Sequence, residues 1–122
     1  MRALTLVGLQ ARSGIAAGEL AHGEQRRLEL AVAIAMQARV LLLDEPLAGT
    51  GAEESAELIA TLRRLKGRYT VILVEHDVEA VFALADRITV LVYGEVLASG
   101  PPAQIRQNQR VIAAYLGEKQ DA

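Results

Sequence analysis

The stretch Val40-Leu41-Leu42-Leu43-Asp44-Glu45-Pro46 decides the fold. An apolar run without alternation is typical of a strand that is covered on both faces, as in a parallel sheet between helices. A second run of this kind, Thr70-Val71-Ile72-Leu73-Val74, ends in Glu75, His76 and Asp77. Because functional groups collect beyond the carboxyl ends of such strands, this edge of the sheet is where we expect the chemistry.

Helical patterns precede, separate and follow the two strands. Apolar residues at helical spacing from Gly23 to about Gln37 predict a largely buried helix that starts at the His22-Gly23 turn. A second run of apolar residues at helical spacing stops at Gly67 and predicts another helix. A shorter helix is expected around Val81. The alternation of strand and helix predicts an α/β layer with right-handed crossovers.

The two ends of the chain are less regular. A helix is expected to end at Gly8, followed by an irregular stretch over residues 10–19. Near the other end, apolar segments flank Gly94-Glu95, which predicts a hairpin with these two residues as its turn. After Gly100-Pro101-Pro102 the chain is expected to be helical.

Composition excludes several classes of protein. The 122 residues are 52% hydrophobic with a formal charge of -2, which excludes a disordered tail and disfavours a basic nucleic-acid binder. Without cysteine there is no disulfide framework or thiolate metal site, and two histidines make a zinc site unexpected. No apolar stretch approaches the roughly 18 residues of a membrane span. We expect no nucleic-acid partner, no transmembrane segment and a cytosolic protein.

Three features are candidates for phosphate chemistry. Asp44 at a strand end can hold Mg²⁺ through water, and the adjacent Glu45 can polarise an attacking water. The small-residue turn Leu20-Ala21-His22-Gly23-Glu24-Gln25 opens a helix whose free N–H groups suit a phosphate, and His76 can contact another. Each feature also has a purely structural interpretation. Asp44 and Glu45 can simply form an acidic turn, residues 20–25 can be a helix cap, and His76 can be a surface histidine in a turn.

In their order along the chain, these motifs resemble the ATP-binding cassette (ABC) transporter ATPases. Residues 20–25 match that family's signature motif, residues 41–45 its Walker B strand, residues 47–51 its D-loop, and His76 its switch histidine. Gly94-Glu95-Val96, Gly100-Pro101 and Ala114-Tyr115-Leu116-Gly117 look like the branched-chain amino acid uptake branch. The resemblance extends over residues 3–117 and implies the C-terminal part of a P-loop NTPase nucleotide-binding domain.

The resemblance implies ATP and Mg²⁺ as cofactors and hydrolysis of ATP to ADP and phosphate. Asp44 would help to hold Mg²⁺ through water, Glu45 would act as the base or water-orienting group, and His76 would contact the γ-phosphate. The D-loop positions are Gly49 and Gly51. The signature residues would bind ATP held by an opposing subunit: Leu20, Ala21, His22, Gly23, Glu24 and Gln25.

The chain departs from the family's pattern in several places. Ala21 stands where many members have a serine, and Gly51 stands where the D-loop usually has an aspartate. The 122 residues contain no G-x-x-x-x-G-K-[ST] phosphate loop and no counterpart of the family's Gln-containing loop. We therefore expect a C-terminal portion that does not hydrolyse ATP alone, with apolar sheet surface left uncovered and marginal stability or self-association.

The expected organisation and partners follow from the resemblance. Residues 1–38 would end a helical subdomain that carries the signature, residues 39–99 would hold the Walker B, D-loop and switch-histidine core, and residues 100–122 a helical tail. Partners would be a second ATPase subunit and membrane permease subunits, at the inner face of the cell membrane. Two alternatives remain: a non-catalytic partner that lends its signature turn to a complete subunit, and an α/β interaction domain with relic motifs.

Overall fold

The computed structural model describes residues 2–116, and the chain divides into two compact units, Met1–Glu75 and His76–Ala122. The first unit opens with helix α1 (Arg2–Leu6), which stops before Gly8 at a positive φ of 76°, as predicted. Two single 3₁₀ turns, η1 (Gln10–Arg12) and η2 (Ala17–Glu19), occupy the segment that was expected to be irregular.

Helix α2 (His22–Ala35) begins at the predicted turn. Its buried residues form one stripe of Gly23, Leu30, Ala31 and Ile34. On the other side Val32 is 53% exposed. The prediction of a largely buried helix therefore holds for the stripe with Leu30, Ala31 and Ile34 and is wrong for Val32, which is exposed.

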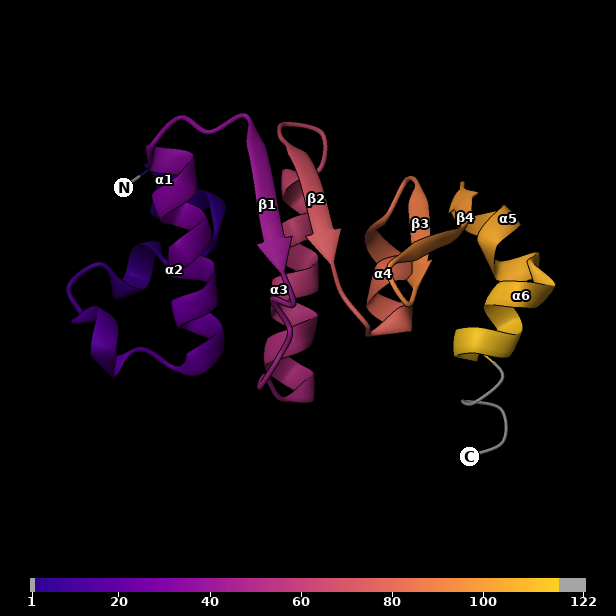
Figure 1. Ribbon diagram of the computed structural model, residues 1–122. Helices are drawn as coiled ribbons and strands as arrows, with labels where there is room; N and C mark the ends of the chain where they lie inside the picture. Colours follow the sequence, from indigo (N-terminus) through magenta and orange to yellow (C-terminus); the bar gives the residue numbers. More distant parts are fainter. Residues whose placement is uncertain (1, 117–122) are drawn as a thin grey trace. The chain divides into compact units, whose positions relative to one another are not determined.

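A right-handed crossover forms the rest of the first unit. Strand β1 (Val40–Asp44), helix α3 (Ala52–Leu65) and strand β2 (Thr70–Val74) follow one another, and the strands pair in parallel from Val40↔Thr70 to Asp44↔Val74. Figure 1 shows α3 behind the two strands. The parallel pair, the crossover and its handedness are as the sequence predicted.

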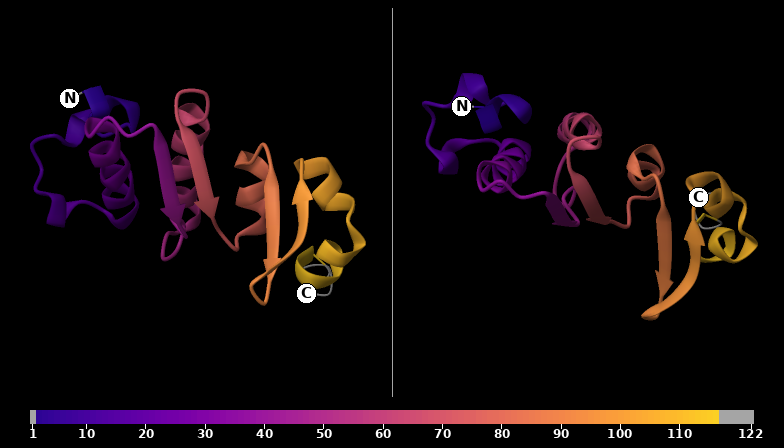
Figure 2. Two further views of the ribbon diagram at one scale, coloured as in Figure 1. Left: turned by 45° about the horizontal axis from the view of Figure 1, so that its top comes forward. Right: turned by 90° about the horizontal axis from the view of Figure 1, so that it is seen from above.

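Within residues 2–116, one face of the parallel pair is covered and the other is not. Figure 2 shows α2 and α3 on the same side of β1 and β2. Leu41, which points toward the helices, is 2% exposed, whereas Leu42 is 72% exposed. We call the uncovered side the open face; it consists of Val40, Leu42, Ile72 and Val74. Burial on both faces was predicted wrongly, and the expectation of uncovered apolar sheet surface is confirmed.

The second unit is a hairpin packed with short helices. Helix α4 (Val78–Leu84) precedes the antiparallel strands β3 (Ile88–Val92) and β4 (Glu95–Gly100). Helices α5 (Pro102–Gln107) and α6 (Gln109–Val111) and a π-helical turn, η3 (Ile112–Leu116), follow. The expectation of helix after Gly100-Pro101-Pro102 is thus confirmed as far as residue 116. The core of the unit contains Ile88, Val90, Ile105 and Val111.

The hairpin turn lies one residue earlier than predicted. Glu95 is already the first residue of β4 and pairs with Val92, so the turn residues are Tyr93 and Gly94. Both have positive φ, 51° and 78°, as a two-residue type I′ turn requires. The hairpin and the β1–β2 pair form separate two-stranded sheets. None of the helices within residues 2–116 combines the length and apolar character needed to cross a membrane.

Candidate functional site

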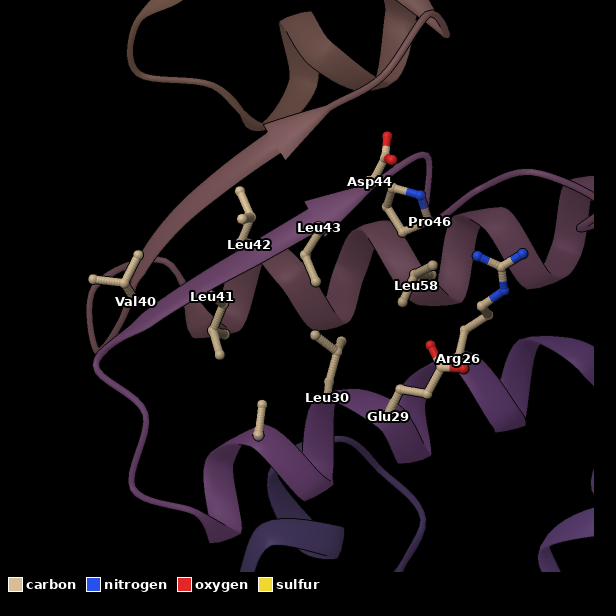
Figure 3. Close-up of a pocket in the computed structure, with 11 residues that line it drawn as sticks. Arg26, Glu29, Leu30, Val40, Leu41, Leu42, Leu43, Asp44, Pro46 and Leu58 are labelled. Carbon is tan, nitrogen blue, oxygen red and sulfur yellow. The ribbon is translucent and has the colours of Figure 1, made fainter.

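The acid pair stands where β1 ends. Asp44 is the last residue of the strand, opposite Val74, and its carboxylate is exposed (Figure 3). Glu45 then turns the chain sharply with a φ of 47°, and its N–H donates to the carbonyl of Val74 at 2.7 Å. Left-handed backbone at a non-glycine residue is unfavourable and is found at functional sites more often than elsewhere. The two acids therefore diverge immediately after the strand.

The loop that follows is held by hydrogen bonds at several points. We call residues 45–51 the acid loop. The Leu47 N–H donates to Glu75 Oε2 at 3.2 Å, which ties the loop to the end of β2. The Thr50 hydroxyl donates to the Leu47 carbonyl at 2.6 Å and lies 2.6 Å from Ser55 Oγ. Gly51 then provides the N-cap position of α3. The loop is thus fixed from both ends.

The turn that enters α2 is organised by two of its own side chains. We call residues 20–25 the entry turn. Ala21 has no side-chain oxygen with which to cap the helix, and instead its N–H donates to Glu24 Oε1 at 3.0 Å. The Gln25 side-chain amide donates to the carbonyls of Ala17 and Leu20, at 3.2 and 3.3 Å. Leu20 is 8% exposed and is a packing residue of this turn.

Glu24 is also paired with a charge from η1. Arg12 Nε donates to Glu24 Oε2 at 2.9 Å, and Arg12 Nη2 to Oε1 at 3.3 Å. The hydrogen bonds from Arg12, and then the one from the Ala21 N–H, hold the pKa of Glu24 below its ordinary value. Glu24 is therefore ionised near neutral pH, and its negative charge lies in the first turn of α2, where the helix dipole favours it.

The structure brings the entry turn and the acid loop together. A Cβ on Gly23 would lie 2.9 Å from Glu54 Cβ at the start of α3. Gly49, at φ 76°, is so close to His22 that a Cβ there would lie 3.5 Å from His22 Nε2. One turn further along α2, Arg26 Nη2 donates to the carbonyl of Ala48 at 3.0 Å. Sequence positions more than twenty residues apart thus form one surface.

His76 belongs to the second unit. It is exposed and directly precedes Asp77, whose carboxylate caps α4 by accepting from the Ala80 N–H at 3.2 Å. Asp44 and Glu45 belong to the first unit. That His76 meets them at one nucleotide stays a prediction.

The donor set near Asp44 fits one kind of metal binding. Within residues 2–116, no three His, Asp or Glu side chains are grouped as a metal cage would require. Mg²⁺ commonly uses one or two carboxylates, completed by water and substrate phosphates. A single exposed carboxylate at a strand end fits a hydrated, phosphate-bound Mg²⁺ and does not fit a cage made by protein alone.

A cavity of about 240 Å³ with a mixed polar and apolar lining lies between α2, β1 and α3 (Figure 3). Leucines from all three elements line it, and Arg26 and Glu29 of α2 also belong to its wall. The leucine side chains Leu41 and Leu43 point into it from β1. Asp44 also belongs to the lining, so the cavity reaches the end of β1 where the candidate Mg²⁺ residue lies.

Sequence reasoning missed four residues that shape this site. Arg12, Arg26, Glu54 and Glu75 each contact the entry turn or the acid loop. Arg26 directly follows the entry turn and Glu75 was named at the end of the second apolar run, so both positions were visible in the sequence, but neither was given a role. Their contacts cross 22 and 28 residues, however, and no local pattern reports contacts at such separations.

Comparison with known proteins identifies the family. A family model described as "ABC transporter" matches residues 1–48, and one described as "Branched-chain amino acid ATP-binding cassette transporter" matches residues 95–121. The chain belongs to the ABC transporter ATPases. The family resemblance derived from the motifs is thereby confirmed, as is membership of a family of ATP-hydrolysing proteins.

Among ABC relatives, the chain is 44% identical over 117 residues to the high-affinity branched-chain amino acid transport ATP-binding protein LivG of Escherichia coli K12. It is 47% identical over 104 residues to BraF of Pseudomonas aeruginosa, which carries the same description. These matches cover 94% and 84% of the chain but only 46% and 41% of the relatives. The chain thus spans less than half of their length.

Solved ABC structures confirm the fold class. MJ1267, an ATP-binding cassette of an ABC transporter in its ADP conformation, matches 95% of this chain and 48% of its own with a TM-score of 0.82 and 23% identity. The match to CbiO1 from Clostridium perfringens, part of the ABC transporter complex cbiONQ, covers 93% of this chain and 46% of CbiO1. Its TM-score is 0.79 and the sequence identity is 27%. The α/β arrangement is thus that of an ABC nucleotide-binding domain.

Proposed function

We propose that this chain supplies the C-terminal part of the ATP-hydrolysing subunit of an ABC importer for branched-chain amino acids. Its similarity to LivG and BraF and the match of residues 95–121 support the branch. Such a subunit would work as a pair with a second ATPase subunit and bind membrane permease subunits at the inner face of the cell membrane. The 122 residues on their own, which contain no phosphate-loop sequence, would not hydrolyse ATP.

In this function the acid loop orients water beside the nucleotide. Asp44 would hold Mg²⁺ through water, and bound Mg²⁺ would neutralise charge on the phosphates. Glu45 would accept a hydrogen bond from the attacking water and turn it toward the γ-phosphate. His76 would donate to a γ-phosphate oxygen. These groups position and polarise, which is most of what phosphoryl transfer requires.

The entry turn would serve the nucleotide of the opposing subunit. Backbone N–H groups at the start of α2 and the positive end of its dipole favour an anion. Gly23 allows the turn to pack closely against Glu54 of α3, while Glu24 and Gln25 keep the turn in shape through the hydrogen bonds described above. Gly49 and Gly51 would form the D-loop beneath it.

One observation carries the proposal: the entry turn and the acid loop, two matches to ABC motifs, lie side by side within one unit. His22 of the turn lies beside Gly49 of the loop. The neighbouring contacts of Gly23 with Glu54 in α3 and of Arg26 in α2 with Ala48 support this arrangement. An unrelated α/β domain would have no reason to bring these stretches together. The contact also means that a ligand which displaces the entry turn would move the acid loop.

The test is a chimera in which this chain replaces the matched 117 residues of E. coli LivG. We expect the purified chimera to hydrolyse ATP, with steady-state phosphate release as the measurement. Glu45→Gln should lower kcat by about 100-fold or more, because a group that activates the attacking water is lost. His76→Ala should also lower kcat.

A matched control is Glu53→Gln, an exposed carboxylate in the first turn of α3. It should leave kcat unchanged. A chimera that folds and binds ATP but hydrolyses none, or one whose turnover survives Glu45→Gln, would contradict the proposed function.

A further inference from the structure

A single side chain from α2 holds the loop that carries Glu45. The Arg26 guanidinium donates to the carbonyl oxygens of Ala48 and Glu45, at 3.0 and 3.4 Å. These carbonyls stand at the two ends of a turn in which the Ala48 N–H donates back to Glu45 O at 3.1 Å. Arg26 therefore bridges the turn that follows the acid pair.

The bridge acts on a residue whose backbone needs support. Glu45 has a φ of 47°, a conformation that persists only when surrounding contacts enforce it. Its N–H is held by the Val74 carbonyl at 2.7 Å, and its carbonyl is held by Arg26. Contacts on both sides of one Cα fix the two flanking peptide planes, and with them the direction in which the Glu45 side chain leaves the backbone.

The chemistry of arginine suits this position. A guanidinium presents several N–H donors in a rigid plane and so can bond two carbonyls together. A lysine ammonium is a single point on a flexible stem and would hold them less rigidly.

Arg26 also connects the acid loop to the entry turn. His22 and Arg26 are four residues apart in α2 and therefore lie on one face of the helix. His22 lies beside Gly49, and Arg26 bonds Ala48 and Glu45, so this face contacts the acid loop at both places. Because the helix is stiff, movement of its first turns would be passed to the Glu45 backbone.

We propose that Arg26 is the positioning residue for Glu45: it sets the orientation of that carboxylate and couples it to the entry turn. The effect of Arg26 on turnover rests on the proposed function, whereas the effect of Arg26 on the acid loop does not. Two measurements separate these parts.

The first measurement is backbone amide exchange, followed by NMR, in the 122-residue chain. In Arg26→Met the amides of Glu45 and Ala48 should exchange about tenfold faster, since a hydrogen bond that holds the loop is removed. In Arg26→Lys they should lie between wild type and Arg26→Met. Arg68→Met, at an exposed arginine before β2, is the matched control and should change neither amide.

Unchanged exchange at Glu45 and Ala48 in Arg26→Met would overturn the proposal. So would an equal acceleration throughout α2 and α3, because it would mean that Arg26 supports the whole unit and not the loop.

The second measurement uses the LivG chimera. Arg26→Met should lower kcat by about 10-fold or more while the KM for ATP stays within about twofold, because the binding groups remain and only the alignment of Glu45 is lost. Arg26→Lys should restore part of kcat. A raised KM with unchanged kcat would overturn the proposal. A wild-type chimera without turnover would contradict the proposed function, while amide exchange would still decide the role of Arg26 in the loop.

Discussion

At the scale of single residues, Gly23 is needed for the packing of α2 against α3. A Cβ at this position would lie 2.9 Å from Glu54 Cβ, so Gly23→Ala forces the two helices apart. We expect the free energy of unfolding to fall by about 1–3 kcal/mol, the usual range for overpacking. Thermal unfolding followed by circular dichroism measures this.

The matched control is Gly18→Ala, where nothing lies within 4 Å of an added Cβ. Its melting temperature should stay close to that of the unaltered chain. Equal melting temperatures for Gly23→Ala and Gly18→Ala would show that the contact with Glu54 is not tight.

The Arg12–Glu24 pair gives the entry turn a dependence on pH. The pKa of Glu24 is lower in the folded chain than in the unfolded chain, where a glutamate has a pKa of about 4.3. The ionised pair therefore stabilises the fold at pH values above the unfolded-state pKa, and this stabilisation is lost as the pH falls through the folded-state pKa. The entry turn should thus keep its structure at neutral pH and loosen only in acid. NMR titration of the Glu24 carboxyl should give a higher pKa in Arg12→Met than in the unaltered chain, and equal values would contradict the pairing.

At the scale of elements, the hairpin turn can be improved. Tyr93 is fully exposed and sits at a φ of 51°, a conformation that asparagine tolerates better. We expect Tyr93→Asn to raise the free energy of unfolding by about 1 kcal/mol. Chemical denaturation of the chain measures the change.

Glu95→Asn is the informative control for this prediction. Glu95 lies in β4, where asparagine is disfavoured, so the substitution should stabilise nothing. Stabilisation by Glu95→Asn and none by Tyr93→Asn would place the turn where the sequence predicted it, at Gly94-Glu95.

Regular elements were predictable because their signals are local. The apolar runs at residues 40–43 and 70–74 and the helical spacings between them each occupy a few consecutive residues. Such a run does not reveal which face of a strand will find a helix to cover it, and for this reason the burial of Leu42 was predicted wrongly. The hairpin turn was displaced because Tyr93 is an uncommon residue at positive φ.

The candidate site was predictable only in part. Its motif residues were recognised by their order, and the structure joins two of those motifs within the first unit. The contacts that hold them depend on tertiary structure: Arg26 reaches a loop 22 residues away, and Glu75 reaches Leu47 across 28 residues. Only the folded first unit brings such residues together.

At the scale of the whole molecule, the open face should cause self-association. Val40, Leu42, Ile72 and Val74 are each at least half exposed and adjacent on two paired strands, and apolar patches of this kind drive association. We expect sedimentation velocity to show oligomers of this chain that Leu42→Glu shifts toward monomer. Val32→Glu, at a similarly exposed valine on α2, should change the distribution little. A monomer at all concentrations would contradict this.

The central claim is that this chain provides a working part of a branched-chain amino acid import ATPase. The most direct test is uptake of labelled leucine by E. coli cells that lack LivG and express the chimera. Our account predicts that the chimera restores uptake and that its Glu45→Gln variant, expressed at the same level, does not. A chimera that is expressed and folded but restores no uptake, or a Glu45→Gln variant that restores it equally well, would contradict the account.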